Sequence, residues 1–295
     1  MEITSAKVKE LREKTGAGMM DCKNALVEAE GNEEKAIELL RKKGLSRVEK
    51  RSGREAKEGL VQSHIRPDGR LGVLVEVNSE TDFVARTDDF RNIVSLITEK
   101  IASAPKIPVS VDEVLDMQAN GSTIRIALNE VASKLGENLI FRRFCRLEVP
   151  TGMEGYIDTY IHTGSKLGVL LFLEATSSVA AAHPEFRTLA REIALHIAAA
   201  NPLAVSREDI SQETIEKEKE IYKAQLEAEG KKKPPEVIEK ILNGKMNKFF
   251  AEVCLIEQSN VKYPDKTVGD LIKETAAKLG GNIVLKQFCR FKVGE

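Results

Sequence analysis

The chain has 295 residues, of which 31% are charged and only 5% aromatic, and it contains no tryptophan. Lysine plus arginine (45) nearly balances aspartate plus glutamate (46), so no overall basic field favours nucleic acid as a partner. No apolar run approaches the roughly 20 residues that span a membrane, and the N-terminus lacks the apolar centre of a signal peptide. We therefore expect a helix-rich cytoplasmic protein that binds neither nucleic acid nor membranes.

The first residues, 1–50, are expected to form a small three-helix bundle. A first helix should end at the glycine-containing turn TGAG (15–18), because glycine readily adopts the backbone that terminates a helix. A second helix is expected at about 20–29, and a third over 32–44, with the asparagine at its start as the N-cap. Such a unit resembles ubiquitin-associated (UBA) domains. The charged stretch 45–58 is expected to be a linker or a solvated helix.

The remainder of the chain contains a duplication. The segment GLVQSHIRPDGRLGVLVEV (59–77) aligns with GYIDTYIHTGSKLGVLLFL (155–173), and KLGENLIFRRFCRLEV (134–149) aligns with KLGGNIVLKQFCRFKV (278–293). Each copy predicts the order strand, strand, helix, helix, strand. We therefore expect an α+β core made of two subdomains, at 55–150 and 151–295.

The last strand of each copy alternates between apolar and polar residues. In the first copy Cys145, Leu147 and Val149 share one face, and charged residues such as Arg146 take the other. This alternation is typical of a sheet that is covered on one side only.

The second copy carries an insertion, because the offset between the copies grows from 96 residues to 144. Two charged stretches with apolar residues at helical spacing occupy 211–258, separated by KKKPP (231–235). They are expected to fold back as an antiparallel coiled-coil hairpin. A 20-residue arm of this kind projects about 30 Å, so it is expected to serve as an interaction device.

Motifs for enzymatic chemistry are missing from the sequence. It contains no GxxxxGK[ST] phosphate loop, no GxGxxG after a strand, no GxSxG and no HExxH. The four cysteines, Cys22, Cys145, Cys254 and Cys289, lack zinc-type spacing and are expected to be reduced core residues. Because no histidine lies near Cys145 or Cys289 in sequence, a cysteine enzyme is disfavoured. We expect no cofactor, no metal site, no small-molecule substrate and no enzymatic activity.

The segment ETDFVAR (80–86) follows the apolar strand at 71–77, and the position of Phe83 there is open to two interpretations. A phenylalanine after a strand usually fills the core. However, Thr87 is a good N-cap for the helix that starts at Asp88, which leaves 79–86 as a separate loop. Phe83 is therefore either core filling or a residue held out for a partner.

The second copy bears on this choice. Where the first copy has TDFVARTDDF, the second has SSVAAAHPEF (177–186), so Phe90 is kept as Phe186 while Phe83 becomes Val179. A residue needed for the repeated fold should be kept in both copies. The loss of Phe83 indicates a role that only the first copy has.

Two long segments resemble the signatures of a known family. They are LREKTGAGMMDCKNAL (11–26) and EVNSETDFVAR (76–86). Both are similar to signatures of the elongation factor Ts family, whose members are nucleotide exchange factors for elongation factor Tu in bacterial translation. The duplicated core with an inserted coiled coil also resembles the family's architecture. One departure lies at FKVGE (291–295), where some members continue into another helix.

The resemblance implies a role for the turn around Phe83. In the family, the matching segment enters beside the Mg²⁺ and phosphate site of elongation factor Tu. Phe83 is then expected to wedge between helices of the partner's nucleotide domain, and Asp82 to engage the partner nearby. The partner is expected both with GDP bound and without nucleotide. The implied contact residues are Thr81, Asp82, Phe83 and Val84.

The resemblance also implies contacts outside this turn. The N-terminal bundle is expected to lie on the same domain of the partner, through Arg12, Met19 and Met20. The second copy, including the hairpin around His162, is expected to dock on another domain. Met19 and Met20 have an alternative interpretation as plugs of the three-helix unit, and His162 has one as an ordinary surface residue.

A second hypothesis makes the chain a peptide-binding adaptor. The three-helix unit would then bind a peptide or a ubiquitin-like protein, and the coiled coil would be a docking arm. This hypothesis leaves unexplained why the segment around Phe83 differs between the copies.

Overall fold

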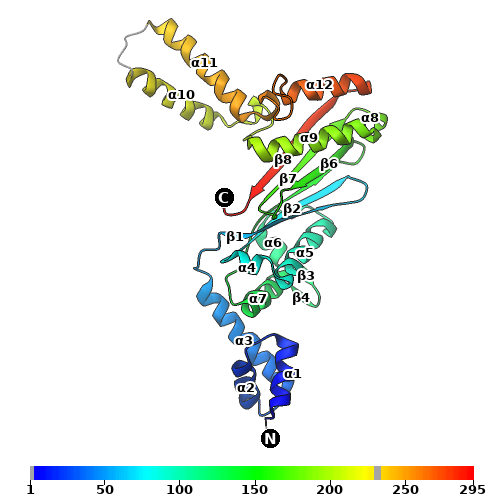
Figure 1. Cartoon of the computed structure of the whole chain (residues 1–295), viewed down its shortest axis with the longest axis vertical. Coiled ribbons are helices and arrows are strands. Elements are labelled where there is room, and N and C mark those ends of the chain that lie inside the picture. The colour runs from blue at the N-terminus through cyan, green and yellow to red at the C-terminus, as the bar shows by residue number, and fades with distance from the viewer. Residues whose placement is uncertain (1–2, 229–233) are drawn as a thin grey trace.

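Three N-terminal helices are followed by two similar units, each a three-stranded antiparallel sheet packed against helices, in a computed structural model that describes residues 3–228 and 234–295 (Figure 1). This is an α+β fold, as expected. The N-terminal helices and the pair α10 and α11 lie at opposite ends of the long axis. The elements are α1 (Ser5–Thr15), α2 (Met19–Glu28), α3 (Glu33–Arg51), β1 (Glu58–Ile65), β2 (Leu71–Ser79), α4 (Asp82–Ala85), α5 (Asp88–Ser103), α6 (Val111–Leu115), β3 (Gln118–Ala119), β4 (Ser122–Thr123), α7 (Ile124–Leu135), β5 (Ile140–Glu148), β6 (Glu154–Ile161), β7 (Leu167–Ala175), α8 (Ser178–Ala182), α9 (Pro184–Ala200), the 3₁₀ turn η1 (Arg207–Asp209), α10 (Gln212–Ala228), α11 (Pro235–Val253), the 3₁₀ turn η2 (Leu255–Glu257), α12 (Val268–Leu279) and β8 (Ile283–Lys292).

The N-terminal helices pack around a small core that includes Val8, Leu11 and Leu26. The first helix ends at Gly16, whose φ of 66° is left-handed, as the sequence predicts. The third helix does not end at Gly44 but continues to Arg51. Gly44 is buried against α7, where an added Cβ would lie 2.6 Å from a side-chain oxygen. This glycine therefore permits close helix packing and does not terminate the helix.

The two sheets have the same strand order, β1-β2-β5 and β6-β7-β8. Helices α5, α6 and α7 cover one face of the first sheet, and α9 and α12 cover one face of the second. The remaining faces pack against each other, and Leu74 and Leu170 are among the residues buried between them. The expectation of a sheet covered on one side only is therefore wrong. The second sheet packs on the apolar face of β5, and the end of α5 lies over the face that carries Arg146, so both faces are covered. Every residue of the central strand β2 is buried.

Arg146 shows the consequence for the polar face of β5. Its guanidinium is buried and donates hydrogen bonds to the carbonyl oxygens of Ile101, at 2.7 Å, and Ala104, at 2.8 Å. These carbonyls belong to the C-terminal end of α5, where helix carbonyls lack partners within the helix. The charged face of the strand is thus packed beneath a helix end.

The two copies meet with approximate two-fold symmetry. The Val61 N–H donates to the Ser165 carbonyl at 2.7 Å, and the Ile157 N–H donates to the Gly69 carbonyl at 2.8 Å. Through the 96-residue offset between the copies, Val61 corresponds to Ile157 and Gly69 corresponds to Ser165, so the two bonds are equivalent. The sheets approach closely at Gly168, where an added Cβ would lie 2.5 Å from a side chain of the other copy.

Two of the four cysteines are paired, which corrects the expectation that all are reduced. Cys145 on β5 and Cys289 on β8 form a disulfide across the sheet interface. Their spacing of 144 residues is the offset between the copies. Cys22 and Cys254 are buried free thiols, and burial raises the pKa of Cys254 to about 11.

Reduction of this disulfide is expected to lower the free energy of unfolding by about 2–4 kcal/mol, because the link restricts a long loop of the unfolded chain. Urea unfolding with and without reductant measures the change. A double variant, Cys145→Ala with Cys289→Ala, is expected to unfold at one urea concentration in both conditions. Identical curves for the oxidised and reduced wild-type chain would contradict the prediction.

The inserted helices α10 and α11 project from the second copy (Figure 1). The Lys245 ammonium lies 5.2 Å from the Tyr222 ring centroid and donates to the Gln225 side chain at 3.0 Å, so side chains join the two helices. Both lie within the predicted insertion at 211–258. The predicted break at 231–235 falls mainly on residues outside the described ones.

Candidate partner-binding site

The segment around Phe83 forms one turn of helix between β2 and α5. Thr81 has an extended backbone and its hydroxyl accepts a hydrogen bond from the Val84 N–H at 3.4 Å, so it caps α4. Thr87 caps α5 by accepting from the Phe90 N–H at 3.3 Å, as predicted. The predicted loop at 79–86 is therefore in part a short helix.

Phe83 points away from the protein, since 77% of its surface is exposed. Its neighbours Val84 and Ala85 are buried in the core of the first copy. Successive residues of a helix are about 100° apart, so burial of these two neighbours turns Phe83 outward. The interpretation of Phe83 as core filling is wrong. An apolar side chain that would gain about 1.5–3 kcal/mol from burial is left in water.

Polar residues adjacent to Phe83 in the sequence form an ion pair and hydrogen bonds that hold the turn in place. Asp82 is half-buried and forms an ion pair with Arg86 at 2.6 Å. The Glu137 carboxylate accepts from the Thr81 hydroxyl at 2.6 Å and from the Thr81 N–H at 3.0 Å. The site thus presents an apolar ring beside a carboxylate, on a turn fixed by hydrogen bonds.

The second copy repeats the turn with different side chains. Ser177 caps α8 by accepting from the Ala180 N–H at 3.2 Å, and Val179 at the position of Phe83 is 76% exposed. This position is therefore outside the core in both copies. The first copy places an aromatic ring there, and the second places a smaller aliphatic side chain.

The other predicted contact residues are also on the surface. Arg12 is exposed on α1, while Met19 and Met20 on α2 are 45% and 64% exposed. The alternative in which the methionines plug the bundle is wrong, because the bundle core is made by other residues. His162 is exposed in the hairpin between β6 and β7, where its Nδ1 lies 2.8 Å from the Tyr160 hydroxyl. These residues lie on α1, on α2 and in the β6–β7 hairpin, so they come from three separate parts of the fold.

A family model and relatives of nearly full length both match this chain and carry the same family name. A family model described as Elongation factor TS matches residues 80–295. Elongation factor Ts of Symbiobacterium thermophilum is 46% identical, with 100% of this chain and 93% of the relative aligned. The chain belongs to the elongation factor Ts family. Elongation factor Ts of Clostridium botulinum (strain Alaska E43) is 45% identical over 99% of this chain and 93% of the relative, and that of Trichlorobacter lovleyi is 42% identical over 100% and 94%. Translation elongation is therefore the process to which this family member belongs.

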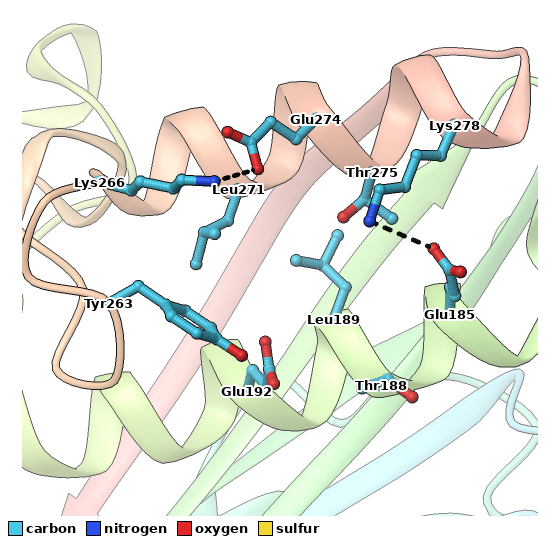
Figure 2. A pocket seen from close by; sticks show the side chains of 10 residues that line it. All are labelled: Glu185, Thr188, Leu189, Glu192, Tyr263, Lys266, Leu271, Glu274, Thr275 and Lys278. Atoms are coloured by element: carbon cyan, nitrogen blue, oxygen red, sulfur yellow. Dashed lines mark hydrogen bonds and ion pairs between the residues drawn. The ribbon is translucent and has the colours of Figure 1, made fainter.

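This member of the elongation factor Ts family also has a groove of about 320 Å³ between α9 and α12 (Figure 2). Its charges are already paired: Lys266 with Glu274 at 2.7 Å, and Lys278 with Glu185 at 3.9 Å. A charged ligand would have to displace these pairs. None of the predicted contact residues lines the groove, so it is not the candidate site.

The described part of this family member holds neither a candidate metal cluster nor a candidate membrane-spanning helix. Over residues 3–228 and 234–295, no cluster of His, Cys, Asp and Glu is arranged to hold a metal ion. Within the same ranges, no helix is long and apolar enough to cross a membrane.

Sequence reasoning missed the residues that hold the turn in place. Arg86 lies inside the quoted segment ETDFVAR, but its partner Asp82 could be assigned only once a helical turn brought the two side chains together. Glu137 lies 56 residues after Thr81. A signal for it exists in the aligned segments KLGEN and KLGGN, because the second copy has Gly281 at this position.

Proposed function

We propose that the chain is a guanine nucleotide exchange factor, which binds elongation factor Tu carrying GDP and promotes the release of that GDP. The observation that carries the proposal is the exposed ring of Phe83, 77% accessible on a turn held by hydrogen bonds. Membership of the elongation factor Ts family supports it. The chain itself makes and breaks no covalent bond in this function.

The proposed mechanism acts on the partner's Mg²⁺ and phosphate site. In nucleotide-binding proteins of this kind a backbone loop cradles the phosphates, and Mg²⁺ bridges two phosphate oxygens. Mg²⁺ needs near-ideal octahedral geometry, so small shifts of its ligands weaken binding sharply. Insertion of Phe83, flanked by Thr81, Asp82 and Val84, would shift these ligands. GDP would then lose both the metal and the phosphate contacts.

Exchange follows from the reciprocity of the two binding events. If the chain weakens the binding of nucleotide to elongation factor Tu, nucleotide must weaken the binding of the chain by the same factor. The chain therefore binds most tightly to the nucleotide-free partner. Incoming GTP displaces the chain and leaves the partner reloaded.

Other surfaces extend the proposed contact. We infer that the N-terminal helices form a UBA-like bundle over residues 1–50. This bundle would lie on the same domain of the partner as the Phe83 turn, through Arg12, Met19 and Met20. Methionine suits such a contact because its flexible thioether side chain adapts to irregular apolar surfaces. The hairpin around His162 would bind a second domain, and the inserted pair α10 and α11 would act as a coiled-coil arm.

Release of fluorescent GDP from elongation factor Tu tests the proposal. Substoichiometric amounts of the chain are expected to accelerate release in the presence of excess unlabelled nucleotide, because each molecule acts repeatedly. A peptide-binding adaptor would leave the release rate unchanged. Absence of acceleration, with a chain shown to be folded by its thermal melt, would reject the exchange function.

A further inference from the structure

The end of α7 lies against the start of the turn that carries Phe83. Gly136 terminates α7 with a left-handed φ of 77°, and the chain then passes through Glu137 and Asn138 into β5. Glu137 is half-buried, and its two carboxylate oxygens accept from the N–H and the hydroxyl of Thr81. Bonds of this kind to an ionised acceptor are stronger than bonds between neutral groups.

The bond to the Thr81 hydroxyl sets the direction of a chain of hydrogen bonds. A hydroxyl has one hydrogen to donate, and a carboxylate can only accept. The Thr81 hydroxyl oxygen lies 2.6 Å from a Glu137 carboxylate oxygen and donates its hydrogen to it. A lone pair of the Thr81 hydroxyl oxygen is therefore left to accept from the Val84 N–H. Glu137 thereby fixes the N-cap of α4, and the N-cap fixes the turn on which Phe83 stands.

Such support matters because α4 has only four residues. A single helical turn closes few hydrogen bonds of its own and is marginal in water without outside contacts. Val84 and Ala85 anchor one side of the turn in the core. Glu137 holds its N-terminal end.

The second copy lacks this support at the same place. In both copies the residue after the second strand accepts a hydrogen bond from an asparagine N–H just after the copy's last helix. Glu80 accepts from the Asn138 N–H at 2.7 Å, and Thr176 accepts from the Asn282 N–H at 2.9 Å. Gly281 stands where the first copy has Glu137, and a glycine offers no carboxylate to Ser177. The carboxylate thus occurs in the copy that presents the aromatic ring.

We propose that Glu137 is a positioning residue, which holds the Phe83 turn in the orientation needed to enter the partner. It acts through Thr81 and does not itself contact elongation factor Tu. This inference rests on the exchange function proposed above. It adds to that function a residue 56 positions further along the chain.

The kinetic test uses Glu137→Gln in the release of fluorescent GDP from elongation factor Tu. The amide keeps one acceptor oxygen but aims N–H groups at a donor, so release is expected to slow about tenfold. Thr81→Val is expected to match it, and the double variant to be no slower than either single one. The control is Glu274→Gln on α12, which removes an ion-pair acceptor from the corresponding helix of the second copy.

A second readout does not depend on the exchange function. The chain has no tryptophan, so Phe83→Trp places a single fluorescent reporter on the turn. Adding Glu137→Gln is expected to lower the fluorescence anisotropy of this reporter, because the turn loses its anchor. Unchanged anisotropy would overturn the inference whatever the release rate. If release slows while anisotropy is unchanged, Glu137 contacts the partner directly. If anisotropy falls but the wild type does not accelerate release, Glu137 positions the turn but the exchange function fails.

Discussion

Phe83→Ala is expected to weaken the complex with nucleotide-free elongation factor Tu by about 2–4 kcal/mol, which corresponds to about a 30- to 1,000-fold rise in Kd. The side chain is 77% exposed in the free chain, so its ring is available to be buried in the complex, and truncation removes the area that the ring would bury there. The melting temperature is expected to stay the same, because the ring contributes little to the core. Calorimetric titration and a thermal melt of each variant measure the two quantities.

Val179→Ala is the matched control for this substitution. It truncates an equally exposed apolar residue at the corresponding position of the second copy. We expect it to leave the affinity within about a few tenths of a kcal/mol of the wild-type value, as surface substitutions usually do. A chain with Phe83→Ala that binds like the wild type, or that melts several degrees lower, would show that Phe83 is not a partner contact.

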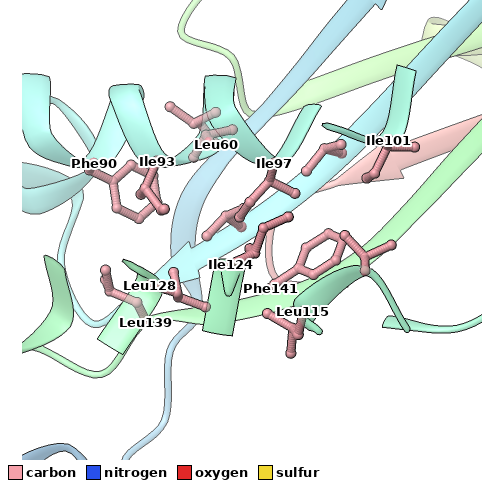
Figure 3. Close-up of a cluster of buried hydrophobic side chains, with 14 of the residues drawn as sticks. Leu60, Phe90, Ile93, Ile97, Ile101, Leu115, Ile124, Leu128, Leu139 and Phe141 are labelled. Carbon is pink, nitrogen blue, oxygen red and sulfur yellow. The ribbon is translucent and has the colours of Figure 1, made fainter. Parts of the chain in front are cut away.

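Phe90→Ala is expected to have the opposite profile, with a loss of about 3–5 kcal/mol in the free energy of unfolding. Phe90 is fully buried between α5 and the first sheet, among the residues drawn in Figure 3. Removing its ring leaves a cavity that the surrounding helices and strands fill only in part. Urea unfolding measures the loss.

The corresponding residue of the second copy provides the comparison for Phe90. Phe186 is also fully buried, and Phe186→Ala is expected to cost a similar amount. At a temperature where a Phe90→Ala chain is still folded, its affinity for elongation factor Tu should exceed that of Phe83→Ala. A stability loss below about 1 kcal/mol, the centre of the range for ordinary substitutions, would contradict the assignment of Phe90 to the core.

Local sequence signals predicted much of the fold. The left-handed glycine at the end of α1, the N-cap role of Thr87 and the repeated strand pairs all appear where the sequence placed them. These features depend on the backbone preferences and hydrogen bonds of neighbouring residues, which a sequence shows directly. The internal duplication added a comparison within one chain, because Phe90 is kept in the second copy and Phe83 is not.

Features that depend on distant contacts were predicted poorly. Gly44 was expected to end a helix but instead lets α3 approach α7. Arg146 was expected on an open face but is covered by the end of α5. Periodicity shows that a strand has two kinds of face, but it does not show which element covers each face. The pairing of Cys145 with Cys289 depends on the same packing of one sheet on the other.

The candidate site was predicted in part. Sequence comparison between the copies singled out Phe83 as different, and the structure shows that the side chain is exposed. Its role in partner binding stays a prediction, as do the roles of Arg12, Met19, Met20 and His162. Glu137 was not predicted because its hydrogen bonds to Thr81 link two segments that lie far apart in the sequence and meet only in the folded chain.

The most direct test of the central claim is the dependence of GDP release on Mg²⁺, measured by stopped flow with the wild-type chain and with Phe83→Ala. If Phe83 acts by disturbing the metal and phosphate site, GDP should leave elongation factor Tu far faster with the wild-type chain than with the variant at millimolar Mg²⁺. In excess chelator the metal is already gone, so the difference between the two chains should shrink towards the difference in their affinities. A ratio of rates that does not change with Mg²⁺ would contradict the account, and equal rates at millimolar Mg²⁺ would exclude Phe83 from exchange.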